Sequence, residues 1–210
     1  MTPRTLPTWL TLTAIVLATA CGLHAMTHGF SAVTSDGARQ LAIAKSPRQL
    51  PSIDLVDSNG ERMDLRAITA ERPYTVVALV YTQCTSLCLV MASSEAFLQA
   101  RLAEAGLSDQ VGLLTISFDP ARDTPEVLAQ YARRVRAEAG VWTVATVADP
   151  ADLGRLLDVF DVVVIPDGTG EYMHNGALFL ADREGRLFEA LPPEAADQAF
   201  ERLAARVRAP

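Results

Sequence analysis

Two apolar runs, residues 74–81 and 111–118, constrain the fold more than any other part of the sequence. Both are rich in aliphatic residues, and neither alternates with polar ones, which is typical of strands covered on both faces of a sheet. The segment between them, residues 91–107, is expected to form a helix that ends near Gly106. Two buried strands joined through a helix pair in parallel by a crossover connection. We therefore expect an α/β fold with a parallel centre.

The flanking sequence predicts antiparallel edges for this sheet. Residues 53–65 predict an N-terminal hairpin around Asn59-Gly60, and residues 177–190 predict a second hairpin. The other expected elements are a helix opened by Thr124-Pro125 and ending at Gly140, a strand at 141–148, and helices at 150–160 and 193–208. Together these elements predict a central mixed sheet flanked by helices.

Cys84 and Cys88 follow the first apolar run, where a strand stops and a helix starts. Sites of α/β folds are built at such positions. At positions i and i+4 of a helix the thiols share one face, so they can converge on a soft metal ion or form a disulfide. A helix N-terminus favours thiolates, so we expect a lowered pKa for both thiols. Metal binding and thiol–disulfide exchange both stay open, and two inert buried cysteines are the third interpretation.

An apolar stretch at residues 9–26 is preceded by a single charge, Arg4. Eighteen helical residues span roughly 27 Å, slightly less than a bilayer core. The stretch predicts an uncleaved membrane anchor, a cleaved signal peptide, a lipoprotein signal modified at Cys21, or a core helix. The lack of a polar face argues against a core helix, and of the other three interpretations we favour the anchor.

Arg4 ahead of the span favours an N-terminus inside and a C-terminal domain on the extracytoplasmic, periplasmic side. Cleavage would instead secrete the domain, and lipidation at Cys21 would attach it to a lipid. The expected organisation is a membrane anchor or signal segment at 1–26, a linker at 27–48 and one domain at 49–210.

The formal net charge of −7 argues against nucleic-acid binding, which needs a basic face. A second closely spaced cysteine pair is absent from the sequence, which excludes a closed four-cysteine zinc site. His174 is the one histidine in residues 49–210, and a lone histidine is usually a surface or core residue. If it converges with the two thiols, the set suits Cu(I), or Cu(II) with an axial ligand.

Three blocks of sequence resemble the Sco/SenC family of membrane-anchored, thioredoxin-fold copper proteins that help to assemble cytochrome c oxidase. The first block is residues 81–88, which ends in the two cysteines. The second, residues 116–125, is close to the family's S-x-D-P-x-x-D-T-P segment, and the third is His174 followed by a strand and a D-x-x-G turn. The resemblance covers about residues 50–208 and extends to the N-terminal anchor.

This resemblance implies a thioredoxin-like fold with Cys84, Cys88 and His174 as copper ligands. It also implies a client copper protein, such as an oxidase subunit, together with other copper or thiol carriers as partners. The chain departs from the family between and after its cysteines, where prolines and an acidic residue are usual. Here Thr85-Ser86-Leu87 and Leu89 occupy those positions, so the client is less well defined than the site.

Two function classes follow from these residues. The first is a metallochaperone that binds copper and delivers it to a client. The alternative is a thiol–disulfide oxidoreductase in which Cys84 and Cys88 are the catalytic residues that reduce client cysteines. A thioredoxin-like peroxidase is disfavoured, because no matching proline precedes Cys84.

Other polar and sulfur-containing residues have less specific interpretations. Asp119 and Asp123 fit either a partner-docking or supporting role beside the site or, as we favour, a turn at Asp119 and a helix cap at Asp123 or Thr124. Met91 and Met173 are soft neighbours of the candidate ligands but are not included among them. Alternation of His24, Met26 and His28 resembles a copper motif, but such a pattern more often marks the polar end of a leader.

Overall fold

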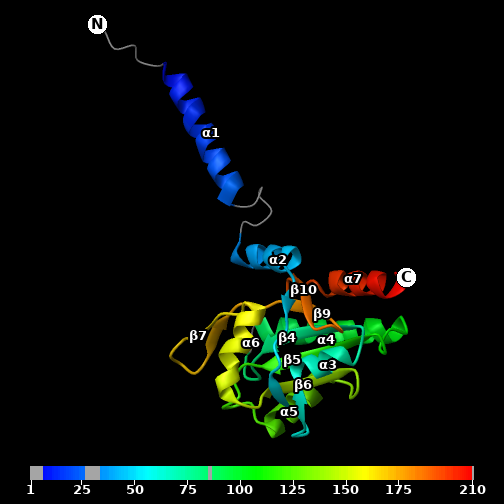
Figure 1. The fold of residues 1–210 in the computed structure, drawn as a ribbon. Helices are drawn as coiled ribbons and strands as arrows, with labels where there is room; N and C mark the ends of the chain where they lie inside the picture. Colours follow the sequence, from blue (N-terminus) through cyan, green and yellow to red (C-terminus); the bar gives the residue numbers. More distant parts are fainter. Residues whose placement is uncertain (1–6, 27–33, 85–86, 210) are drawn as a thin grey trace. The chain divides into compact units, whose positions relative to one another are not determined.

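The computed structural model describes residues 7–26, 34–84 and 87–209 (Figure 1). The chain divides into two compact units, Met1–Ala42 and Ile43–Pro210, which are described separately. Of the linker expected at 27–48, residues 27–33 lie outside the described ranges, as do Thr85 and Ser86 between the cysteines.

The first unit begins with helix α1, Thr8–Met26. Its residues Thr8–Ala25 have a mean hydropathy of 1.5 and none of them is buried, so the helix is long and apolar enough to cross a membrane. Helix α2, Ser35–Lys45, falls inside the segment for which the sequence predicted no secondary structure. Thr34 supports its start, because Gly37 N donates to Thr34 Oγ1 at 3.1 Å, the contact of a helix cap.

The second unit is built on an eight-stranded mixed sheet with the order β1-β10-β9-β4-β5-β6-β2-β3 (Figure 1). Its parallel centre consists of β4 (Tyr74–Val80), β5 (Val111–Ser117) and β6 (Trp142–Val147). Antiparallel strands flank this centre: β9 (Leu178–Asp182), β10 (Arg186–Leu191) and β1 (Arg48–Gln49) on one side, and β2 (Asp54–Asp57) and β3 (Arg62–Asp64) on the other. The predicted α/β class, parallel centre and two hairpins are confirmed.

Helices cover this sheet. They are α3 (Leu65–Ala70), α4 (Leu87–Glu104), α5 (Pro125–Val135), the 3-10 turn η1 (Pro150–Asp152) with α6 (Leu153–Phe160), and α7 (Ala196–Arg208). Helix α4 contacts both α5 and α7. All seven residues of β5 are buried, as are six of the seven residues of β4, so these two strands form the middle of the core.

Several boundaries differ from those the sequence predicted. Helix α4 begins at Leu87 instead of 91, which places Cys88 inside its first turn. Helix α5 ends at Val135 instead of Gly140, because Arg136 takes a left-handed conformation with φ 59° and its N–H closes the last turn. A short two-stranded sheet, β7 (Val164–Pro166) with β8 (Tyr172–His174), was not predicted.

Candidate metal centre

Cys84 and Cys88 come together because β4 ends shortly before Cys84 and α4 begins one residue before Cys88. Cys84 follows β4, with its N–H directed at Tyr81 O at 3.3 Å. Cys88 is the second residue of α4, and its backbone N–H donates to Cys84 Sγ at 3.4 Å. The first N–H groups of a helix lack partners inside the helix, so the sulfur takes a capping role here. Both cysteines are buried, and no disulfide joins them in this structure.

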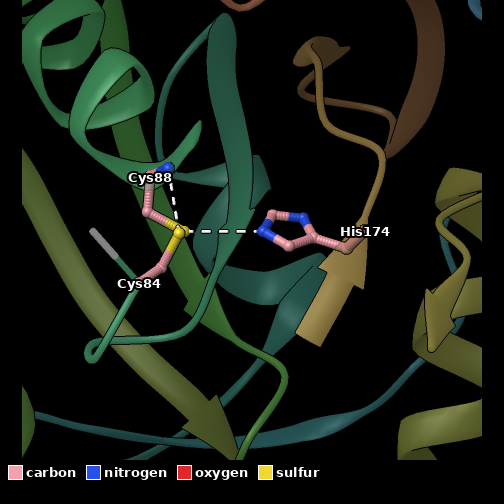
Figure 2. Close-up of side chains that lie close together, drawn as sticks. All are labelled: Cys84, Cys88 and His174. Atoms are coloured by element: carbon pink, nitrogen blue, oxygen red, sulfur yellow. Dashed lines mark hydrogen bonds between the residues drawn. The ribbon is translucent and has the colours of Figure 1, made fainter. Parts of the chain in front are cut away.

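His174 reaches the same place from a distant part of the chain (Figure 2). It is the last residue of β8, and its Nε2 lies 3.6 Å from Cys88 Sγ. The two sulfur atoms and one imidazole nitrogen all lie within 4.8 Å of one another. Nitrogen and sulfur ligands bind an ion at about 2.0–2.3 Å, so two ligands of the same ion lie no more than about twice that distance apart. The three side chains therefore fit around a single small ion.

The other ring nitrogen of His174 lies 3.0 Å from the carbonyl oxygen of Asn175. A carbonyl only accepts hydrogen bonds, so this contact favours the tautomer with its proton on Nδ1. Nε2 then presents a lone pair toward the sulfurs, which is how metal-binding histidines are commonly oriented. The side chain of Asn175 fixes this turn, since its Oδ1 accepts from Val163 N at 2.8 Å and its Nδ2 donates to Asp161 O at 3.2 Å.

Aromatic rings enclose the imidazole. The ring centroid of His174 lies 5.0 Å from that of Phe118 and 5.8 Å from that of Tyr81, both edge-on. Tyr172 packs edge-on against the same two rings, at 5.1 Å from Tyr81 and 5.8 Å from Phe118. Met173, between the two inward-facing residues of β8, is 64% exposed. The imidazole therefore packs against the rings of Tyr81 and Phe118, which directly follow β4 and β5.

Burial, and secondarily a hydrogen bond with Cys84, raises the pKa of the Cys88 thiol well above its usual range. The expectation that the helix N-terminus lowers this pKa is wrong for Cys88, because desolvation of a thiolate that is 2% exposed is the larger effect. A cation that replaces the thiol proton removes this penalty, since it neutralises the thiolate within the same apolar surroundings.

The loop between β5 and α5 supports the cysteine side of the site. The buried Asp123 carboxylate accepts from Thr82 N at 2.9 Å, from Thr82 Oγ1 at 2.6 Å and from Ser117 Oγ at 2.5 Å. Asp123 therefore fixes the end of β4 two residues before Cys84, and of the two cap residues expected, Thr124 and not Asp123 is the N-cap of α5. The turn expected at Asp119 is present, with Asp123 N donating to Asp119 O at 2.9 Å.

Sequence reasoning did not identify the groups that hold the site together. Thr82, Arg122, Glu171 and Tyr172 all contact residues around the three candidate ligands. Thr82 and Arg122 lie inside residues 81–88 and 116–125, two of the blocks that resemble a known family, and this was the one available signal. Of the methionines considered, Met91 is fully buried in the core.

A cavity of about 240 Å³ opens beside the two cysteines, between α4 and α5. Besides Cys84 and Cys88, its walls include Leu89, Tyr131 and Arg134. The Arg134 guanidinium donates to Thr82 O at 2.9 Å and lies 5.1 Å from the Tyr131 ring centroid. The thiols are thus buried by their neighbours but adjoin a space that a small ligand or a side chain can enter.

A mixed sheet with flanking helices, which brings two cysteines after a central strand together with one histidine, defines a thioredoxin-like protein with a candidate soft-metal site. The family model for SCO1/SenC matches residues 44–208. The chain belongs to the SCO1/SenC family.

Individual relatives agree with this assignment. A protein of Stutzerimonas stutzeri whose name describes it as copper-binding is 27% identical over 177 residues, which is 82% of each chain. The structure of Bradyrhizobium japonicum ScoI with copper bound is 25% identical, with a TM-score of 0.54 over 73% of this chain and 98% of that one. BsSco, a member of the Sco family of cytochrome c oxidase assembly proteins in which a disulfide switch was identified, is 16% identical, with a TM-score of 0.66 over 76% and 94%.

These comparisons confirm the predicted family and the predicted thioredoxin-like fold. The name of the Stutzerimonas stutzeri relative and the copper in the Bradyrhizobium japonicum ScoI structure support copper as the ligand. An apolar N-terminal helix is present, as expected for an anchor. Of the alternating residues at its end, His28 lies outside the described residues.

Proposed function

We propose that this chain is a metallochaperone that binds one copper ion through Cys84, Cys88 and His174 and delivers it to a client site. The observation that carries the proposal is the placement of two sulfur atoms and one imidazole nitrogen within 4.8 Å of one another in an SCO1/SenC chain. Two thiolates and an imidazole are a soft, low-coordinate set that suits Cu(I), and one further ligand makes the set suitable for Cu(II).

In this proposal copper is the cargo, and the chain's own residues determine how it is accepted. Each thiol must lose a proton to become a ligand, so copper affinity rises with pH. The raised pKa of Cys88 extends this dependence to higher pH, since its thiol keeps its proton over a wider pH range than an exposed thiol until an ion displaces it. The cavity beside Cys84 and Cys88 gives a client ligand a path to the ion, so that transfer proceeds by ligand exchange.

The proposed client is a copper protein such as a respiratory oxidase subunit, and the proposed partners include other copper or thiol carriers. This extends what the sequence resemblance implied. Helix α1 supports attachment to a membrane, with segment 1–26 as the anchor, 27–48 as the linker and 49–210 as the copper-binding domain. We place that domain on the extracytoplasmic side on the basis of Arg4, which precedes the helix.

The test is a Cu(I) titration of the reduced full-length protein in detergent, in competition with a chromophoric chelator. One equivalent of copper is expected to bind. His174→Ala is expected to weaken binding and to change the visible and EPR spectra of the Cu(II) form. His24→Ala makes the same substitution in α1 and is expected to match the wild type, as is Cys21→Ser, which removes a thiol outside the proposed site. If His174→Ala also matches the wild type, the three-ligand site is wrong.

A second candidate function, thiol–disulfide exchange, is favoured by the contact between Cys88 N and Cys84 Sγ. The two sulfurs already lie within 4.8 Å, and a disulfide requires about 2.05 Å. In that reaction Cys84 and Cys88 lose two protons and two electrons, and a client disulfide gains them to become two thiols. A reduction potential near −300 mV or below suits a reductant. Failure to exchange with a client disulfide peptide at neutral pH would exclude this candidate.

A further inference from the structure

The histidine side of the site is not part of the main sheet. His174 lies on β8, and β7 and β8 form a two-stranded sheet of their own, whereas the cysteines follow β4 and open α4. The ladder of the large sheet therefore does not set the distance between the imidazole and the thiols. Contacts to the β7–β8 hairpin, together with the short connection from His174 to β9, set this distance instead.

Arg122, on the loop between β5 and α5, makes several of these contacts at once. Its Nη1 donates to the Gly170 carbonyl oxygen at 2.5 Å. Its guanidinium carbon lies 5.0 Å from the ring centroid of Tyr172 and 5.8 Å from that of Tyr81, within the range of cation–π attraction. Gly170 precedes β8, and Tyr172 shares an inward-facing side of β8 with His174. The Arg122 side chain thus contacts both Gly170, which precedes β8, and Tyr172 within β8.

Asp119 holds the guanidinium in this orientation. Arg122 Nε donates to the Asp119 carboxylate, and this contact raises the pKa of Arg122, so the guanidinium stays charged. Asp119 is itself fixed, because its N–H donates to Ser117 Oγ at 3.0 Å, and Ser117 Oγ donates to Asp123. Asp123 in turn binds the end of β4 before the first cysteine. A continuous chain of polar contacts therefore runs from the cysteine side to the histidine side.

A second tie acts on the same segment of the hairpin. The Tyr81 hydroxyl donates to the Glu171 carboxylate, and Tyr172 N lies 3.4 Å from the same hydroxyl oxygen. Gly170, Glu171 and Tyr172 are consecutive, so Arg122 and Tyr81 hold three adjacent residues that lead to His174. Tyr81 also packs against the imidazole directly.

We propose that Arg122 is a positioning residue that holds the β7–β8 hairpin so that Nε2 of His174 stays within reach of an ion bound by Cys84 and Cys88. The inference rests on the proposed function for its copper readout. Its structural part, that Arg122 fixes the imidazole in the metal-free protein, is independent of copper. A lysine at this position keeps the charge but lacks the fork that reaches Asp119 and Gly170 together.

The metal-free readout is the NMR signal of the His174 ring in the full-length protein in detergent. In the wild type, ring currents of Phe118 and Tyr81 are expected to displace its proton shifts from random-coil values. Arg122→Ala is expected to move these shifts toward random coil, and Arg122→Lys to move them part of the way. Arg155→Ala is the matched control, since Arg155 pairs with Asp152 on the surface, and it should leave the shifts unchanged. Unchanged shifts in Arg122→Ala would overturn the proposal.

The copper readout is a double-mutant cycle between Arg122→Ala and His174→Ala, measured by Cu(I) competition. Loss of a group that orients a metal ligand typically weakens metal binding about 10–100-fold, and we expect a loss in that range for Arg122→Ala. In the His174→Ala background the same substitution should have no further effect. An equal loss in both backgrounds would mean that Arg122 does not act through His174. If Arg122→Ala does not fold, the cycle is repeated with Arg122→Lys. If His174→Ala alone has no effect, the copper assignment fails while the NMR result stands.

Discussion

The two sides of the candidate site are built in different ways. The cysteines lie where β4, buried and paired on both sides, meets the 18-residue helix α4. His174 lies on a three-residue strand of a separate hairpin, held by side chains of Tyr81, Arg122 and Asn175. The core therefore defines the thiol side, and the histidine side depends on a few polar and aromatic contacts. A substitution on the thiol side should affect stability and binding, whereas one on the histidine side should affect mainly binding.

Removal of a thiolate is expected to give the largest effect on copper. Cys88→Ser replaces a soft ligand with a hydroxyl that does not ionise at neutral pH, so two of the three proposed ligands remain. We expect Cu(I) affinity to fall by more than the roughly 100-fold typical of losing a group that only orients a ligand. Competition titration measures this, and Cys21→Ser in α1 is the control. If Cys88→Ser and His174→Ala bind Cu(I) with equal affinity, the distinction between the thiol side and the histidine side is wrong.

The second effect concerns the core beneath the cysteines, where α4 carries the fully buried Glu95. Thr115 Oγ1 donates to its Oε1 at 2.7 Å, and Oε2 has no hydrogen-bond partner among the residues that the structure describes. Burial raises the pKa of Glu95 from 4.5 to about 8. Between these values the folded protein holds a proton that the unfolded chain has released, so the free energy of unfolding falls as pH rises, by about 1.4 kcal/mol per pH unit.

Urea unfolding at pH 5, 6, 7 and 8 measures this slope. Glu95→Gln keeps an acceptor for Thr115 and removes the titration, so the variant should lose the decline and become more stable than the wild type near pH 8. Glu104→Gln on the exposed end of α4 is a control of the same type. Equal slopes in wild type and Glu95→Gln would show that this carboxyl does not titrate within the folded core.

The contrast between the two sides also explains what could be predicted from the sequence. Continuous apolar runs indicated β4 and β5, because a strand buried on both faces leaves that pattern. The position of Cys84 and Cys88 at a strand–helix junction followed from it. Helix α4 was expected to begin four residues too late, since its first turn contains both a cysteine and the exposed Leu89 and has no clear periodicity.

The histidine side left no comparable pattern. Strands β7 and β8 have only three residues each, and their sequences do not alternate between apolar and polar residues, so neither leaves the pattern that marks a half-buried strand. The contacts of Arg122 and Tyr81 that hold the hairpin span 48 and 90 residues of sequence. The spacing of residues in the sequence therefore did not decide whether His174 is a metal ligand. Only the resemblance to Sco/SenC indicated that it lies beside the cysteines.

A smaller effect is expected from Asp123→Asn, which tests how the thiol side is anchored. The carboxylate accepts three hydrogen bonds, and an amide with one acceptor oxygen cannot satisfy Thr82 and Ser117 equally well. We expect a loss of about 2 kcal/mol in the free energy of unfolding. The control is Asp152→Asn, whose side chain pairs with Arg155 on the surface. A stability equal to the wild type would mean that the end of β4 is held by strand pairing alone.

The smallest effect is expected from Tyr81→Phe, which removes one hydroxyl and keeps the ring against His174. Without the hydroxyl, the Glu171 carboxylate and Tyr172 N no longer have their partner on Tyr81, and both groups belong to the hairpin. Because the main sheet does not depend on these interactions, the free energy of unfolding should change by about 1 kcal/mol or less. The hairpin should nevertheless loosen, so amide hydrogen exchange of β8 should accelerate while that of β4 and β5 stays unchanged. Faster exchange in all three strands would show that the hairpin and the core open as one unit, and the two sides of the site would then not be separate.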